Sequence, residues 1–165
     1  MELSKLTDLE IINLYSELIT ELKSRGIIRT KNLLGDLGEH LAIQYYCNTP
    51  NLPGLQAAPA GTQNIDAISR KGDRYSIKSS SGKLTGVFYG LNDPGDPEPS
   101  TPKFEFVILV IFDDSFKLIN ILELNWEQFL TLKRWHKTMR GWNLTISKKL
   151  RETATCIYPP PSPGA

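Results

Sequence analysis

The residues best suited to chemistry lie close together in the stretch from Asn64 to Ser80, which reads NIDAISRKGDRYSIKSS. Asp66 brings a carboxylate, and Ser76 and Lys78 bring a hydroxyl and an ammonium at alternate positions of one segment. A carboxylate and an ammonium are costly to bury in paired strands unless they face solvent, each other or a ligand that needs both. The presence of Asp66 and Lys78 in this stretch therefore favours a functional site with polar side chains.

The pattern of this stretch predicts a β-hairpin. Asn64 to Ser69 alternates polar and apolar residues, residues 70–73 contain a glycine suited to a turn, and Arg74 to Ser80 returns to a period of two. Because side chains alternate across a strand, Ser76 and Lys78 share one face of the second strand. The polar groups would therefore lie on one side of a pair of strands.

Two helices are expected before the hairpin. Thr7 to Arg25 carries apolar residues at steps of three and four, which indicates an amphipathic helix with a packing role. Asn32 is suited to cap a second helix over Leu33 to Cys47. Gly38 costs about 1 kcal/mol in a helix against alanine, so its natural use is a close approach of this helix to a sheet. That approach places Glu39 beside the sheet.

The rest of the chain predicts an α/β fold, a sandwich with a mixed central sheet flanked by helices. The further elements expected are a short strand at Leu55 to Ala58, a central strand at Phe104 to Phe112, its partner at Phe116 to Leu124, a helix from Trp126 to about Lys137, a strand at Trp142 to Ile146 and a last helix capped by Ser147. A single domain over residues 1–158 and a disordered proline-rich tail over 159–165 are predicted.

Composition narrows the class of protein. The 165 residues carry a formal charge of +1, so any nucleic-acid site must come from local clustering of charge. Cys47 and Cys156 make no disulfide framework and show no zinc spacing. The amino terminus is unlike a secretory signal, and no apolar run reaches the roughly 18 residues of a membrane span. A cytoplasmic protein without a membrane partner is therefore expected.

Three short motifs occur in the order Gly38-Glu39, Ile65-Asp66-Ala67 and Tyr75-Ser76-Ile77-Lys78. This order resembles the PD-(D/E)XK nuclease superfamily, the fold of many restriction enzymes and Holliday-junction resolvases. In that superfamily a Gly-Glu on the first helix, an Asp on one strand and a Glu-x-Lys on its hairpin partner surround one or two magnesium ions. The resemblance covers about Leu34 to Phe112 and implies a restriction-endonuclease-like sandwich. A looser likeness reaches both ends of the chain and is to a group of uncharacterised bacterial proteins.

The resemblance implies magnesium-dependent hydrolysis of phosphodiester bonds in double-stranded DNA, with Mn²⁺ able to substitute and restriction as one role. Asp66 and Glu39 would bind the metal, Lys78 would stabilise charge, and all three groups should converge on a volume the size of a hydrated ion. Ser76 stands where the superfamily usually has an acid, and a neutral hydroxyl is a weak magnesium ligand. Ser76 would then assist the other site residues without being a main metal ligand. Glu39 is a better candidate for the missing acidic ligand than the acidic residues of the loop 92–103.

A basic region follows the predicted strands. Residues 126–152 contain seven lysines and arginines and two glutamates, a local charge of +5, interleaved with aromatic residues. This composition suits phosphate contacts and base stacking, although a solvated helix face would look the same. The residues expected to contact a duplex are Ser79, Ser80, Lys83, Lys133, Arg134, Lys137 and Arg140.

Other functions stay open on the sequence. A nuclease-like fold that has lost catalysis would bind DNA or a partner protein, and Ser76 favours this alternative. A structural oligomer subunit would have no affinity for DNA. An edge strand could pair two protomers into a homodimer. Glu39 could instead be a solvated helix residue paired with Lys31 or Lys83.

Overall fold

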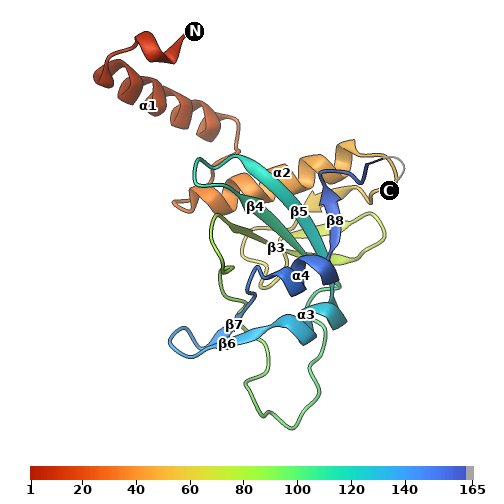
Figure 1. The fold of residues 1–165 in the computed structure, drawn as a ribbon. Helices are drawn as coiled ribbons and strands as arrows, with labels where there is room; N and C mark the ends of the chain where they lie inside the picture. The colour runs from red at the N-terminus through yellow and green to blue at the C-terminus, as the bar shows by residue number, and fades with distance from the viewer. Residues whose placement is uncertain (163–165) are drawn as a thin grey trace.

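A six-stranded mixed sheet lies at the centre of the protein, seen in a computed structural model that describes residues 1–162 (Figure 1). The strands, in their order across the sheet, are β1 (Leu55–Ala57), β2 (Ala67–Ser69), β3 (Arg74–Ser80), β4 (Phe106–Phe112), β5 (Leu118–Asn125) and β8 (Thr155–Tyr158). β3 and β4 run parallel, and the other described neighbours run antiparallel. Residues 163–165 of the predicted tail lie outside the described residues.

The helices begin where polar caps predict. They are α1 (Asp8–Ser24), α2 (Leu33–Asn48), α3 (Trp126–Leu132) and α4 (Lys148–Thr153), preceded by a short 3-10 turn, η1 (Leu3–Lys5). Thr7, Asn32, Asn125 and Ser147 each accept a hydrogen bond from a backbone N–H of the first turn that follows. None of the described helices combines the length and apolarity that a membrane span requires.

Both faces of the sheet are covered, which confirms a mixed α/β fold. α2 packs on one face, where Ala42 and Tyr46 meet the apolar side chains of β3 and β4. The other face carries α3, α4 and the loop residue Phe88, together with the hairpin of β6 (Arg134–His136) and β7 (Gly141–Asn143). β4 is buried almost throughout, as its apolar run predicts. Its side chains divide between the two cores.

Gly38 is the point at which α2 comes closest to the sheet. A Cβ atom built on Gly38 would lie 1.8 Å from Oγ of Ser79 and 3.3 Å from Cβ of Val110. The first distance is far inside van der Waals contact, so no larger residue fits without movement of the helix or strand. The predicted close approach is confirmed, and it sets the position of the next residue, Glu39, at the rim of the sheet.

Several predicted elements have different bounds in the structure: the strand expected at Trp142 to Ile146 is β7, and two others differ more in kind. The helix expected to reach Lys137 ends at Leu132, and the chain turns into β6, where Trp135 meets Trp142 of β7 edge-on at a centroid distance of 5.2 Å. Continuing the helix would break this packing. The first hairpin strand begins at Ala67 and not at Asn64, because Asn64 is in a left-handed conformation with φ of 63°.

α1 has the predicted bounds but not the predicted packing role. None of its 17 residues is buried. Figure 1 shows α1 projecting from the sheet-bearing part of the chain, to which the segment 25–32 connects it. The amphipathic pattern correctly predicts a helix but says nothing about which surface covers its apolar face.

A partly buried hydrogen bond joins α2 to β5. The Tyr46 hydroxyl donates to Oε2 of Glu123 at 2.6 Å. Burial raises the pKa of the Glu123 carboxyl, and the negative charge of Asp73 raises it further, although the Tyr46 hydrogen bond opposes both. Glu123 therefore retains its proton to a higher pH in the folded protein than in the unfolded chain.

We expect Glu123→Gln to remove part of the pH dependence of stability. A raised carboxyl pKa contributes stability below the unfolded pKa of about 4.3 and loses it as pH rises through the folded value, about 1.4 kcal/mol for each unit of difference. Glutamine can still accept the Tyr46 hydrogen bond. Chemical denaturation from pH 4 to 8 should show wild type losing stability relative to Glu123→Gln, whereas Glu127→Gln, an exposed change on α3, should run parallel to wild type.

Candidate functional site

Asp66 is held at the start of the hairpin by its own backbone and side chain. Its N–H donates to the Tyr75 carbonyl at 2.8 Å, which pairs it with β3 one residue before β2 begins. Its Oδ2 accepts the Ile77 N–H at 2.6 Å and the Ser76 hydroxyl at 3.3 Å. Two donors from β3 therefore fix the orientation of this carboxylate.

Ser76 and Lys78 share the face of β3 that meets Asp66. Ser76 is 1% exposed, so its hydroxyl acts within the protein. Lys78 is two residues further along, about 7 Å by the rise of a strand. Its Nζ lies 5.1 Å from the centroid of the Phe88 ring, a cation–π contact. The predicted hairpin and shared face are confirmed.

Glu39 is half-buried at the rim of the sheet and forms an ion pair. Nη2 of Arg29 lies 2.8 Å from Oε1 of Glu39, with exposed side-chain fractions of 50% and 22%. This pair raises the pKa of Arg29, and the charges of Asp36 and Asp66 raise it further. The partner of Glu39 is thus Arg29 and not Lys31 or Lys83.

An open cavity of about 400 Å³ brings these groups together. Asp66, Glu39 and Arg29 line it, with Asp36 and Thr30 beside them. Lys78 does not line this cavity in the described part of the chain. Two of the three predicted site residues therefore reach one hollow, while the ammonium group of the third contacts Phe88 instead. The predicted convergence of all three is not seen in this arrangement.

Asp36 is a structural carboxylate at this cavity. Its Oδ2 accepts hydrogen bonds from the N–H groups of Arg29 and Thr30 at 2.8 and 2.6 Å and from the Thr30 hydroxyl at 3.0 Å. Burial would raise the pKa of Asp36, but these hydrogen bonds together lower it. Asp36 thus fixes the loop that carries Arg29 against the first turn of α2.

The oxygens at the cavity suit a hard cation. Oδ1 of Asp66 and Oε2 of Glu39 accept no hydrogen bond from any residue between 1 and 162. Magnesium is usually held by one or two carboxylates plus water and substrate phosphate, so two carboxylates fit it. No group of three or more metal-binding side chains exists among residues 1–162. Any metal would thus depend on Asp66 and Glu39, and Arg29 would compete for Glu39.

The residues predicted to contact nucleic acid separate into two groups. Ser79 faces α2, where its buried Oγ has no hydrogen-bond partner within residues 1–162. Ser80 is 6% exposed, and its hydroxyl donates to the Leu84 carbonyl at 2.7 Å. Neither hydroxyl is on the surface, so both serines are used in internal packing here, and their DNA contacts stay a prediction. The close packing of Gly38 on Ser79 is the physical reason that the first hydroxyl is buried.

The basic residues of this set lie at the surface. Lys83 is exposed on the loop after β3, and Lys137 and Arg140 belong to the turn of the β6–β7 hairpin. Lys133 and Arg134 line a hollow of about 430 Å³, whose other charged residue is Lys149. Three hydroxyl residues, Thr131, Thr145 and Ser147, line the same hollow, and none of its described lining residues is acidic.

Lys133 is partly withdrawn from solvent in this hollow. Its Nζ lies 3.1 Å from the centroid of the Trp142 ring, and burial lowers its pKa. Arg134 and Lys149 form no ion pair within residues 1–162, so their charges are free for a ligand. The lining suits an anion such as a phosphate.

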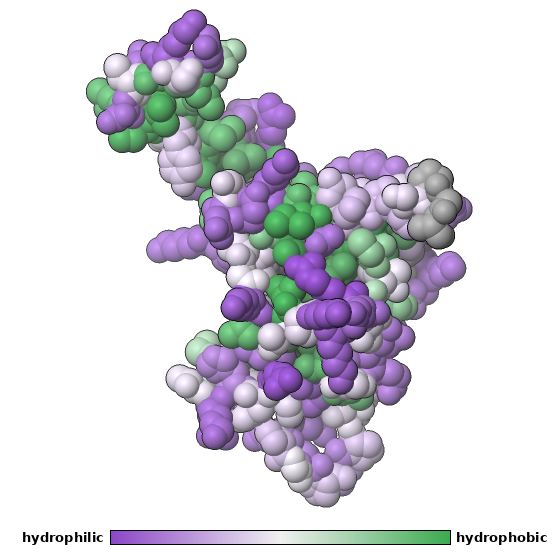
Figure 2. Space-filling model, in the orientation of Figure 1, coloured by the Kyte–Doolittle hydropathy of each residue, from purple (hydrophilic) through white to green (hydrophobic). Residues whose placement is uncertain are grey.

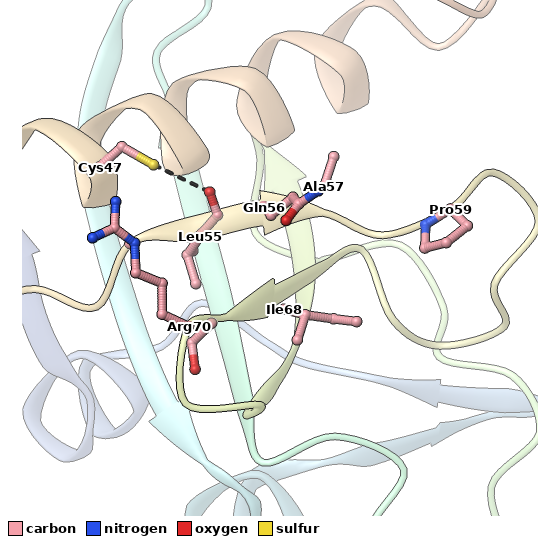
Figure 3. A pocket seen from close by; sticks show the side chains of 9 residues that line it. Cys47, Leu55, Gln56, Ala57, Pro59, Ile68 and Arg70 are labelled. Carbon is pink, nitrogen blue, oxygen red and sulfur yellow. Dashed lines mark hydrogen bonds between the residues drawn. The ribbon is translucent and has the colours of Figure 1, made fainter.

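A larger cavity, of about 630 Å³, lies beside the edge strand β1 (Figure 3). Figure 3 shows Cys47 of α2 donating from Sγ to the Leu55 carbonyl, with Arg70 and Ile68 extending from the neighbouring β2 end. None of the described lining residues is a carboxylate or a predicted site residue. The site is therefore placed at the smaller cavity, where the carboxylates lie.

Arg29 and Lys149 are the residues at these sites that the sequence analysis missed. Arg29 lies in a loop ten residues before Glu39. The only sequence signal for its role was the presence of an arginine shortly before the helix that Asn32 caps. Lys149 was counted in the basic region but not assigned a contact.

A scan against models of protein families and a search of curated proteins found no match to the chain.

Proposed function

We propose that this protein is a magnesium-dependent endonuclease acting on double-stranded DNA. The observation that carries the proposal is that the carboxylates of Asp66 and Glu39 line one open cavity beside the β2–β3 hairpin. Ser76 and Lys78 occupy the adjoining face of β3. A sandwich of the restriction-endonuclease type, a restriction role and a cytoplasmic location belong to the same proposal.

Each residue at the cavity would have a separate role in cleavage. Asp66 and Glu39 would hold Mg²⁺, which when bound polarises the scissile phosphate and lowers the pKa of a coordinated water. The Ile77 N–H and the Ser76 hydroxyl keep Asp66 oriented toward the cavity. Arg29 holds Glu39 in place beforehand. Lys78 would leave Phe88 to stabilise charge on the phosphate, a role that suits a compact ammonium on a flexible stem.

The basic hollow supports DNA as the substrate. Lys133, Arg134 and Lys149 bring three positive charges to one concave surface with hydroxyl groups between them. Phosphate contacts of this kind position a duplex without reading its sequence. Lys83, Lys137 and Arg140 are exposed and extend the positive charge over nearby loops.

Removal of the metal tests the proposal directly. Supercoiled plasmid incubated with the protein should be nicked in Mg²⁺ or Mn²⁺, and excess EDTA should stop nicking, with activity returning when Mg²⁺ is restored. The physical reason is that two carboxylates without a cation would repel the phosphate they must approach. Agarose gels quantify the nicked form. Nicking that persists in EDTA would contradict the assignment.

A second candidate is a nuclease-like protein that binds DNA or a partner protein without cleaving it. The Arg29–Glu39 ion pair and the contact of Lys78 with Phe88 favour it, because each engages a group that catalysis would need. The same plasmid samples discriminate the two. Binding that weakens with salt, unchanged by Mg²⁺ and without nicking, would select this candidate.

A further inference from the structure

The apolar face of α1 is exposed and has no partner among the described residues, since no residue of α1 is buried. Seven of the twelve large exposed apolar side chains among the described residues lie between residues 1 and 18. On α1 itself, Leu9, Ile12, Tyr15 and Leu18 are 66%, 62%, 60% and 55% exposed. Figure 2 shows apolar surface on the projecting helix. A contiguous exposed apolar surface of this kind marks an interaction site.

Apart from Leu9, which lies toward the polar side, the exposed apolar residues of α1 form one stripe along the helix. At 100° per residue, the apolar side chains from Ile11 to Leu22 fall within an arc of roughly 160°, the width of a helix face that packs against a partner. The polar residues Asn13, Glu17 and Thr20 lie on the opposite side. Asp8 to Ser24 carries four acids and one lysine, which argues against an anionic lipid surface because such helices are rich in lysine and arginine.

The sequence of α1 is complementary to itself in the antiparallel direction. Suppose that two antiparallel copies of α1 cross midway between residues 16 and 17. Each residue is then level with the residue of the second copy for which the two residue numbers add up to 33. The apolar residues near the middle of the stripe then match as Ile11 with Leu22 and Tyr15 with Leu18. These four positions lie near the middle of the stripe, so the centre of the seam is apolar.

The same register also pairs opposite charges at both ends. Glu10 and Arg25 flank one side of the stripe, while Asp8 and Lys23 lie toward the other. In an antiparallel pair like flanks meet, so Glu10 comes level with Arg25 of the second copy to within two residues, about 3 Å along the axis. Asp8 meets Lys23 in the same way. Glu10 and Arg25 also have partners in their own helix: Glu10 accepts the Thr7 N–H, and Arg25 pairs with Glu21. In a parallel pair in register, each charged residue would lie beside the same residue of the second copy, so like charges would meet.

We infer that α1 forms a symmetric antiparallel pair with α1 of a second copy of this chain. This inference is independent of the proposed cleavage reaction. A 17-residue helix is about 25 Å long, so the interface is small and the dimer should form at micromolar concentrations and above. Because each body follows the carboxyl end of its helix, the two sheets and their cavities lie at opposite ends of the pair.

Sedimentation equilibrium of the full chain under reducing conditions tests this. Over roughly 1 to 500 μM, the range in which small interfaces associate, wild type should pass from monomer to dimer. Leu18→Glu should raise the dissociation constant at least about tenfold. Thr20→Glu adds the same charge to the polar face and should leave it unchanged. Circular dichroism checks that α1 stays helical in both.

Charge exchange tests the register. Lys23→Asp should weaken the dimer about threefold to tenfold because the two-fold axis breaks two ion pairs at once. Asp8→Lys combined with Lys23→Asp should restore the wild-type constant. A monomeric wild type, or a dimer that Leu18→Glu leaves intact, would overturn the inference. So would a monomer that binds phosphatidylcholine vesicles through Leu18, which would assign the face to a membrane surface.

Discussion

The Asp66→Asn variant is expected to nick supercoiled plasmid at least about 100-fold more slowly than wild type in Mg²⁺, a barrier increase of about 2.7 kcal/mol. Asparagine keeps an oxygen that can accept the Ile77 N–H, so the hairpin geometry seen at 2.6 Å should survive. The change removes one charge from a donor set of two carboxylates. Nicking rates at several Mg²⁺ concentrations measure the loss.

Asp114→Asn is the matched control for this prediction. Asp114 is exposed in the turn between β4 and β5, so the same chemical change is made away from the cavity. Its nicking rate should equal that of wild type. Melting temperatures of both variants should stay within a few degrees of wild type. An Asp66→Asn variant that is folded and fully active would remove Asp66 from the proposed reaction.

Gly38→Ala is expected to lower the free energy of unfolding by about 1 to 3 kcal/mol, the usual range for inserting a methyl group into a packed contact. The added Cβ would meet Oγ of Ser79 at 1.8 Å and Cβ of Ser79 at 2.9 Å. The better helix propensity of alanine offsets about 1 kcal/mol at most. Urea denaturation measures the difference in unfolding free energy.

A compensating change on the strand should restore part of this loss. Ser79→Gly removes the two nearest atoms and leaves Cβ of Val110, at 3.3 Å, as the next nearest to the new methyl group. The double variant should therefore be more stable than the sum of the two single changes predicts. Gly86→Ala is the control, since nothing lies within 4 Å of its added Cβ. A Gly38→Ala protein as stable as wild type would contradict the close packing.

Local sequence signals predicted much of the fold. The capping residues Asn32 and Ser147 mark true helix starts, and the apolar run of β4 marks the buried central strand. These features depend on neighbours within a few residues along the chain, so their physics is visible in the sequence. Boundaries such as the end of α3 depend on packing across a hairpin, which periodicity does not show.

The candidate site was only partly predictable for the same reason. The residue pattern was enough to predict that Asp66, Ser76 and Lys78 belong to a hairpin and that Gly38 allows α2 to approach the sheet closely. The partners of these residues became visible only in the folded structure, which brings Arg29 to Glu39 and Phe88 to Lys78. It also decided that α1 covers no part of the described sheet. Periodicity specifies which side of an element is apolar, whereas the surface it meets depends on contacts between distant segments.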